Sequence, residues 1–182
     1  MIVSFISLGC DKNRVNTEQM MALCLQSGMT VQEDCAGSDV VVVNTCGFID
    51  SAKLEAIETI LSVAELKAAD RVGKILVTGC LSQRYQAELL EELPEVDGIM
   101  GTGSYGDIVS AVEQVAAGQK FSRFTDISGP VEELPRVIST PCLPAHCRGV
   151  QQPLRLLHYP GPAGQVPQPP DGGHPHRGQG PL

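Results

Sequence analysis

Three cysteines of this chain each end an apolar run that has the length of a β-strand. The runs cover residues 2–10, 40–46 and 74–80, and their last residues are Cys10, Cys46 and Cys80. These thiols are 36 and 34 residues apart in sequence. If the runs are neighbouring parallel strands, their carboxyl ends share one edge of a sheet, where ligands usually bind. Three converging thiolates favour a metal or cluster site over a disulfide.

The types of available ligand narrow the choice of metal. Residues 1–140 contain no His, which excludes a zinc site of three cysteines and one histidine there. A carboxylate as fourth ligand stays possible, but sets of thiolates favour zinc or iron–sulfur clusters. Three cysteines can hold a cubane cluster that leaves one iron open to substrate. The plainer alternative is that the three cysteines merely pack at the ends of buried strands.

Small and polar residues flank the three thiols. A glycine stands directly beside each cysteine, at positions 9, 47 and 79. Glycine allows close backbone approach or a positive φ, and so leaves room for a bulky inorganic group. Asn13, Asn44 and Thr45 either orient the cysteine loops by hydrogen bonding or only satisfy the backbone of turns.

The other four cysteines show no such pattern. Cys24 lies among Met and Leu on the apolar face of an expected helix, which is typical of a small buried hydrophobe. Cys35 is expected in a loop beside acidic residues. Cys142 and Cys147 lie in a C-terminal region of unusual composition.

Strand-like and helix-like segments alternate through the first two thirds of the chain. We expect strands at residues 2–8, 40–43, 74–78 and 98–100, and weaker strand character at 121–126. We expect a first helix at residues 15–26 and a second helix that begins with Asp50 or Ser51 as its N-terminal cap. Two more helices are expected at residues 82–93 and 107–117. The second helix carries Leu54, Ile57, Leu61 and Ala64 on one apolar stripe, which predicts the buried face.

This alternation predicts an α/β fold, with a parallel sheet flanked by helices on both faces. We assign residues 1–118 to this domain and 119–140 to a linker. Residues 141–182 contain all four His and ten of the thirteen Pro, with one acidic residue and no Lys. That composition is typical of a disordered tail.

The composition also limits which binding partners and which cellular location are expected for this protein. The net charge is −8, and residues 1–140 carry 10 basic against 20 acidic residues. An acidic surface repels phosphate backbones, so we expect no direct nucleic-acid contact and favour a basic protein partner, or simply a charge that aids solubility. No membrane-spanning run or secretory signal is expected, which indicates a cytoplasmic protein.

Three motifs at these cysteines resemble those of the radical-SAM methylthiotransferases. They are Ser7-Leu8-Gly9-Cys10-Asp11-Lys12-Asn13, Asn44-Thr45-Cys46-Gly47-Phe48-Ile49-Asp50, and Val77-Thr78-Gly79-Cys80-Leu81. The resemblance covers about residues 1–140, and the first two motifs look like the branch that methylthiolates an aspartate of a small-subunit ribosomal protein. It implies an auxiliary 4Fe–4S cluster on Cys10, Cys46 and Cys80.

The family's second 4Fe–4S cluster, which cleaves S-adenosylmethionine, implies a Cys-x-x-x-Cys-x-x-Cys motif that this chain lacks. The genetic code allows several codons for each of residues 146–161. If these codons are read from their second base, they permit a different string of fifteen consecutive residues, and that string contains the missing cysteine motif. We therefore expect a frameshift near codons 140–145, and the chain as written is expected to be inactive. The nucleotide sequence around codon 140 tests this expectation.

Three other functions stay open on the sequence. One is the tRNA-modifying branch of the same family, which a substrate assay distinguishes. Another is a non-catalytic module that binds a cluster or docks a protein. The third is a flavodoxin-like ligand-binding domain with structural cysteines, which the absence of bound iron would favour.

Overall fold

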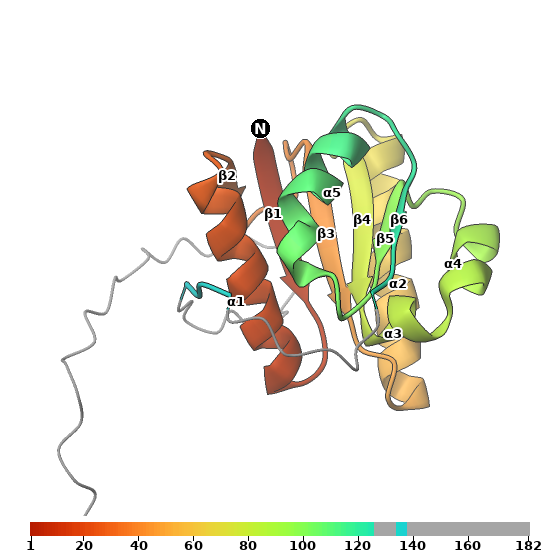
Figure 1. Ribbon diagram of the computed structural model, residues 1–182. Helices are drawn as coiled ribbons and strands as arrows, with labels where there is room; N and C mark the ends of the chain where they lie inside the picture. The colour runs from red at the N-terminus through yellow and green to blue at the C-terminus, as the bar shows by residue number, and fades with distance from the viewer. Residues whose placement is uncertain (126–133, 138–182) are drawn as a thin grey trace, which may run out of the picture.

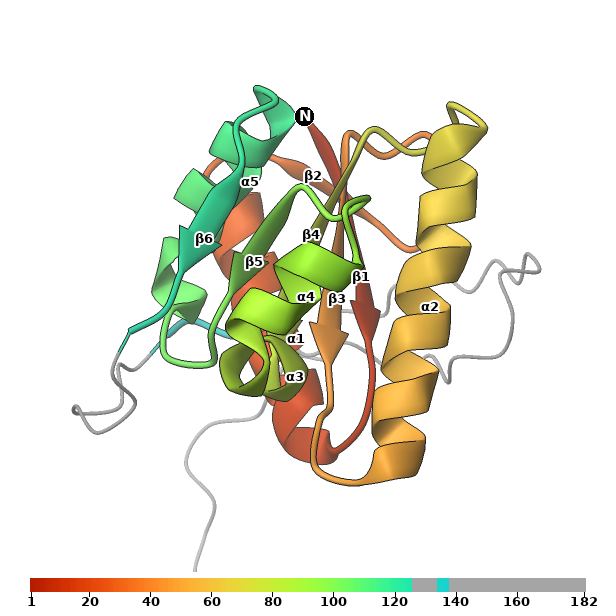
Figure 2. The same cartoon turned by 90° about the vertical axis from the view of Figure 1, so that its right-hand side faces the viewer.

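The computed structural model describes residues 1–125 and 134–137. Its core is a six-stranded, fully parallel sheet between two layers of helices (Figures 1 and 2). The α/β fold class predicted from the sequence is therefore confirmed. The strands are β1 (Ile2–Ser7), β2 (Thr30–Gln32), β3 (Val40–Thr45), β4 (Lys74–Gly79), β5 (Gly98–Met100) and β6 (Phe121–Arg123). The helices are α1 (Asp11–Gln26), α2 (Asp50–Ala68), α3 (Cys80–Arg84), α4 (Gln86–Glu92), the 3-10 turn η1 (Tyr105–Asp107) and α5 (Ile108–Ala116).

The strand order places the three cysteine-ending strands side by side. That order is β2-β1-β3-β4-β5-β6. Ser7 pairs with Asn44, and Thr45 pairs with Gly79, so β1, β3 and β4 end at nearly the same level. From β1 the chain continues to β2 at one edge of the sheet, whereas from β3 it continues to β4 in the direction of the other edge, so the strand order reverses between β1 and β3. Ligands of open parallel sheets usually bind at such a reversal of strand order, beyond the carboxyl ends of the strands.

Two apolar cores lie on the two faces of the sheet. Strand β3 begins with four consecutive valines, none of which is exposed, as expected of a strand covered on both faces. On one face, alternate strand residues pack against α2, α3 and α4. On the other face they pack against α1 and α5, which Figure 2 shows on one side of the sheet. The side chains of Ile108, Val112 and Val115 in α5 are fully buried there, as the sequence predicted.

The structure corrects several boundaries. Helix α1 begins at Asp11, four residues before its predicted start, and the short strand β2 was not anticipated. The single helix predicted at residues 82–93 is two helices, because the backbone leaves the helical region at Tyr85 (φ −121°, ψ 42°). The cap of α2 is Ile49 rather than Asp50 or Ser51, and no side chain caps that end.

The predicted buried stripe of α2 is wrong for two of its four residues, because Ile57 and Ala64 are half-buried but Leu54 and Leu61 are not. Leu54 is 61% exposed and Leu61 is 44% exposed. The buried residues are Ala56, Ile60 and Val63, which lie on a face rotated from the predicted stripe. The reason is that α2 carries apolar residues on more than one face, so periodicity alone did not select the side that meets the sheet.

We expect this difference to be measurable. Ile60→Ala removes a fully buried side chain and should lower the free energy of unfolding by about 2–5 kcal/mol. Leu61→Ala, one residue along, should lower it by less than about 1 kcal/mol, because much of that side chain already contacts water. Urea unfolding followed by circular dichroism compares the two. Equal losses would contradict the observed face.

Two regions named in the sequence are only partly described. The expected linker, residues 119–140, contributes β6 to the sheet and a short segment, 134–137, that contacts α1. Its remaining residues and the expected tail, 141–182, lie outside the described residues. Within residues 1–125 and 134–137, no helix is both long and apolar enough to cross a membrane.

Candidate functional site at the carboxyl edge of the sheet

The three strand-ending cysteines follow three adjacent strands. Cys10 follows β1 and is the N-cap of α1, Cys46 follows β3, and Cys80 follows β4 as the first residue of α3. Cys10 and Cys80 are exposed, whereas Cys46 is 8% exposed. The sequence predicted that these thiols would reach one edge of the sheet, and the backbone places them there.

Close backbone packing at the neighbouring glycines draws the three loops together. A Cβ added to Gly9 would lie 2.4 Å from the Cβ of Cys46 and 3.0 Å from its Sγ. A Cβ added to Gly47 would lie 2.9 Å from the Cα of Leu81. The Cys10 loop therefore packs on Cys46, and the Cys46 loop packs on the start of α3. Only glycine fits at these contacts, as the sequence suggested.

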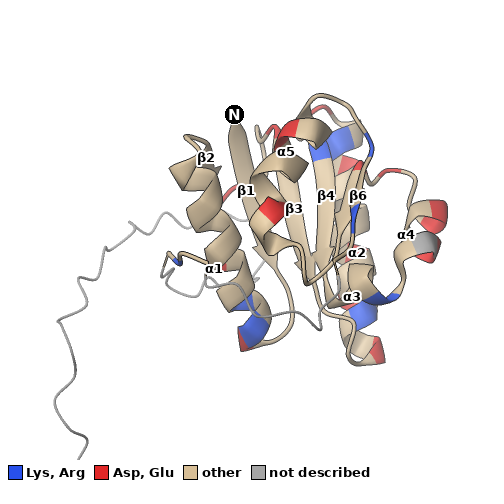
Figure 3. Cartoon of the chain, in the orientation of Figure 1, with Lys and Arg blue, Asp and Glu red and all other residues tan. Residues whose placement is uncertain are grey.

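The charges around Cys80 act on the pKa of its thiol. Burial raises the pKa of Cys80, and negative charge on Cys46 and Cys10 raises it further. The ammonium group of Lys12 lowers the same pKa. Figure 3 shows basic residues at the start of α1, beside this edge, and acidic residues on α4. The site is thus a group of thiols with a cation at its border on an otherwise acidic domain.

Tyr105 is a neighbour of the site that sequence reasoning missed. It lies in η1 and is 7% exposed. Burial raises the pKa of its hydroxyl above the usual range, and the charges of Cys80 and Cys10 act in the same direction. No local pattern marks this tyrosine in the sequence, because the η1 turn reaches the cysteines only through the sheet order.

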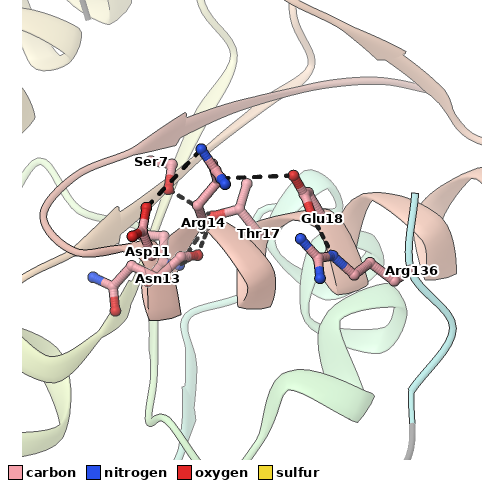
Figure 4. A network of polar contacts seen from close by, with 8 residues as sticks. Ser7, Asp11, Asn13, Arg14, Thr17, Glu18 and Arg136 are labelled. Carbon is pink, nitrogen blue, oxygen red and sulfur yellow. Dashed lines mark hydrogen bonds and ion pairs between the residues drawn. The ribbon is translucent and has the colours of Figure 1, made fainter. Parts of the chain in front are cut away.

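A buried amide network joins the loops that carry Cys10 and Cys46, and Figure 4 shows the part of it around Asn13 and Thr17. Nδ2 of Asn13 donates to the carbonyl oxygens of Leu8 (2.9 Å) and Thr45 (3.1 Å). Nδ2 of Asn44 donates to the carbonyl oxygen of Asn13 (2.8 Å) and to Oγ1 of Thr17 (3.0 Å). These bonds join α1 to the ends of β1 and β3. The sequence had left open whether Asn13 and Asn44 orient the loops or only satisfy turns.

The same helix carries a buried carboxylate that was not anticipated. Glu18 is 1% exposed and pairs with the guanidinium groups of Arg14 and Arg136 (Figure 4). The backbone N–H of Val137 also donates to the carbonyl oxygen of Glu18 (3.3 Å). The 134–137 segment is thereby held against α1, far from it in sequence. The sequence signal that could have revealed this carboxylate is the presence of one acidic residue, Glu18, on the face of α1 that is otherwise buried.

The donor set at this edge consists of three soft thiols. Among the described residues, no three His, Cys, Asp or Glu side chains gather closely enough to hold one metal ion. A zinc ion needs sulfur ligands about 2.3 Å away, whereas thiolates on a cluster bind different iron atoms. The site therefore supplies soft sulfur donors of the type that clusters use, two of them exposed and one shielded.

The remaining cysteines lie away from this edge. Cys24 is fully buried in the core beneath α1, and burial raises the pKa of its thiol to about 12, so the prediction of a small core residue is confirmed. Cys35 lies in the loop between β2 and β3, as expected, but its side chain is 2% exposed and packs in the core beneath α2. Cys142 and Cys147 lie outside the described residues.

Comparison with known proteins gives a consistent match over the same region. The chain is 44% identical over 147 residues to "Ribosomal protein uS12 methylthiotransferase RimO" of Clostridioides difficile (strain 630), covering 80% of this chain and 33% of that protein. A protein of the same name from Synechococcus sp. (strain RCC307) is 46% identical over 140 residues, covering 76% and 28%. The chain thus spans about a third of the length of these relatives. The model of a family described as "Uncharacterized protein family UPF0004" matches residues 2–101, which include all three cysteines, so the chain belongs to this family.

Proposed function

We propose that Cys10, Cys46 and Cys80 ligate an auxiliary 4Fe–4S cluster at the carboxyl edge of the sheet. The observation that carries this proposal is the packing of three cysteine loops on one another beyond adjacent strands. With three protein ligands, such a cluster leaves one iron open to bind a sulfur-containing group. The chain's own residues hold the thiolates apart, exclude bulky side chains from the loops and place Lys12 at the border.

We further propose that the chain is the N-terminal part of a methylthiotransferase. The relatives named above modify ribosomal protein uS12, and the family resemblance assigns the methylthio group to an aspartate. Such a reaction uses S-adenosylmethionine and a second 4Fe–4S cluster, whose cysteine motif is absent from residues 1–182. This chain alone is therefore proposed to be inactive. Modification of a ribosomal protein implies a cytoplasmic site of action.

The charge of the domain supports a protein rather than an RNA substrate. Residues 1–140 carry twice as many acidic as basic residues, 20 against 10. A small-subunit ribosomal protein is basic, so attraction favours its approach. A tRNA substrate would meet repulsion over most of this surface.

Anaerobic reconstitution with iron and sulfide tests the cluster. The purified 182-residue chain should take up about four irons, as one 4Fe–4S cluster requires. A triple variant, Cys10→Ala with Cys46→Ala and Cys80→Ala, should lose this uptake, whereas Cys24→Ala, a core cysteine, should keep it. Iron and sulfide analysis with the visible absorption spectrum gives the result. Unchanged iron in the triple variant would refute the ligand assignment.

The domain organisation is a separate proposal. We propose that the cluster domain extends past residue 118 to include β6, that the rest of 119–140 leads toward a radical-SAM barrel, and that 141–182 are encoded out of frame. Sequencing the gene around codon 140 decides the last point. If no other frame there encodes a Cys-x-x-x-Cys-x-x-Cys motif, the frameshift is excluded.

A further inference from the structure

A single side chain contacts all three cysteine-bearing segments. Asn13 is 2% exposed and lies in the first turn of α1. Its Nδ2 donates to Leu8, two residues before Cys10, and to Thr45, directly before Cys46. Its Oδ1 faces the Sγ of Cys80 at 4.0 Å. Its own backbone N–H donates to the carbonyl oxygen of Cys10 at 3.0 Å.

The chemistry of the contact suits an asparagine. The carbonyl oxygens of Leu8 and Thr45 lie where β1 and β3 end, so they need donors from outside the strands. The two N–H groups of one amide supply both. With Nδ2 turned to two carbonyl oxygens, Oδ1 is necessarily the atom that faces Cys80, which settles the orientation of the amide. A carboxylate of the same shape would instead oppose two oxygens with a third.

The asparagine is itself held in place. Its backbone carbonyl oxygen accepts hydrogen bonds from Nδ2 of Asn44 (2.8 Å) and from Oγ1 of Thr17 (2.9 Å). Thr17 is also bonded to Ser7 in β1 (3.1 Å). Figure 4 shows Asn13 and Thr17 close to Ser7 on the same side of α1. Helix α1, β1 and β3 therefore fix the amide before any ligand is present.

We propose that Asn13 is a positioning residue that sets the spacing of Cys10, Cys46 and Cys80. Its bonds to Leu8 and Thr45 fix the separation of the first two loops, and its Oδ1 limits where the third thiol can move. The role of this spacing in cluster binding rests on the proposed function. The positioning itself concerns the protein without iron and is measurable there.

The test compares Asn13→Asp with Asp97→Asn in the full 182-residue chain. Asn13→Asp keeps the shape of the side chain and removes both donors. Asp97, just before β5, accepts hydrogen bonds at the opposite edge of the sheet, so Asp97→Asn weakens the fold without touching Asn13, its partners or a cysteine. Unfolding midpoints of both iron-free variants report their general loss of stability. Asn13→Ser, which retains one donor, replaces Asn13→Asp if the latter does not fold.

The first measurement is the rate at which iodoacetamide alkylates each cysteine of the iron-free, reduced protein, read by peptide mass spectrometry. In Asn13→Asp, the shielded Cys46 should react about tenfold faster than in the unsubstituted protein, because the hydrogen bond to Thr45 beside it and the one to Leu8 in the Cys10 loop packed on it are both lost. In Asp97→Asn, compared at equal distance below its unfolding midpoint, the rate should stay within about twofold of the unsubstituted value. Equal rates in the two variants would overturn the positioning role.

The second measurement is iron uptake on anaerobic reconstitution. Asn13→Asp should take up less than half the iron that Asp97→Asn takes up, and equal uptake would overturn the link to the cluster. If the unsubstituted chain holds no iron, the proposed function fails. The alkylation rates then still decide whether Asn13 positions the loops, so the two failures are distinguishable.

Discussion

Gly79→Ala should lower the free energy of unfolding by about 3 kcal/mol or more, because this glycine meets two separate obstacles. Its φ is +103°, a backbone conformation that side chains strongly disfavour. An added Cβ would also lie 2.3 Å from the carbonyl oxygen of Thr45 and 2.5 Å from Oδ1 of Asn44. The first atom belongs to the backbone of β3 and the second to a fully buried side chain, so neither can move aside cheaply.

Gly118→Ala separates the two obstacles. Gly118 also has a positive φ, +82°, but nothing lies within 4 Å of its added Cβ. This control should lose only the conformational term, about 1–2 kcal/mol. Urea unfolding at neutral pH under reducing conditions measures both variants. Similar losses would mean that the contact with Thr45 is not as tight as the structure shows.

Gly79→Ala also bears on the site. Cys80 is the next residue, and relief of the clash requires β3 and β4 to separate at the edge where their cysteines follow. If the variant folds, we expect its iron uptake on reconstitution to fall, whereas that of Gly118→Ala should not. The close approach of Gly79 to Thr45 is thus what lets Cys46 and Cys80 lie beyond adjacent strands.

The sequence predicted the cysteine edge because short-range signals were sufficient there. An apolar run that ends in Gly-Cys or Thr-Cys marks both the strand and its end, and parallel strands bring such ends together. The shared edge of Cys10, Cys46 and Cys80 could therefore be predicted without the full order of the strands. Helix α5 was predicted equally well, because Ile108, Val112 and Val115 form a single apolar stripe.

Features that depend on long-range packing were not predicted. Leu54 and Leu61 follow the same periodicity as a buried face, yet the sheet selects the face with Ile60. The position of Asn13 three residues after Cys10 looks like that of an ordinary turn residue. Its hydrogen-bond acceptors, the carbonyl oxygens of Leu8 and Thr45, come together only because β1 and β3 pair. The sequence offered the amide but not its acceptors, so its role stayed open until the contacts were known.

Asp97 illustrates the same limit and leads to the second large effect. This residue precedes β5 and is 8% exposed. Its carboxylate accepts hydrogen bonds from the ammonium groups of Lys67 in α2 and Lys74 in β4, and from the backbone N–H of Ile75 (2.9 Å). A single carboxylate therefore links a helix and two strands at the edge opposite the cysteines.

We expect Asp97→Asn to lower the free energy of unfolding by about 2–4 kcal/mol at neutral pH. The asparagine would place its NH2 group where one carboxylate oxygen lies, so that one of the two lysines would face a donor and lose its acceptor. Asp107→Asn is the matched control. Asp107 pairs with Arg123 at 2.8 Å, but that arginine side chain is 54% exposed, so the loss there should be below about 1 kcal/mol.

The pH dependence of this effect has a defined sign. Burial by itself would raise the pKa of Asp97, but hydrogen bonds from Lys67 and from the N–H of Ile75 outweigh it and hold the pKa below its ordinary value of 3.8. A carboxyl whose pKa is lowered by folding stabilises the protein above its unfolded pKa, and that contribution is lost as the pH falls through the folded pKa. Urea unfolding at several pH values should therefore show a constant difference between the unsubstituted protein and Asp97→Asn above about pH 5. The difference should shrink below about pH 4, as the carboxyl of Asp97 takes up its proton. A difference that persists unchanged in acid would mean that lost packing, and not the charge of Asp97, accounts for the destabilisation.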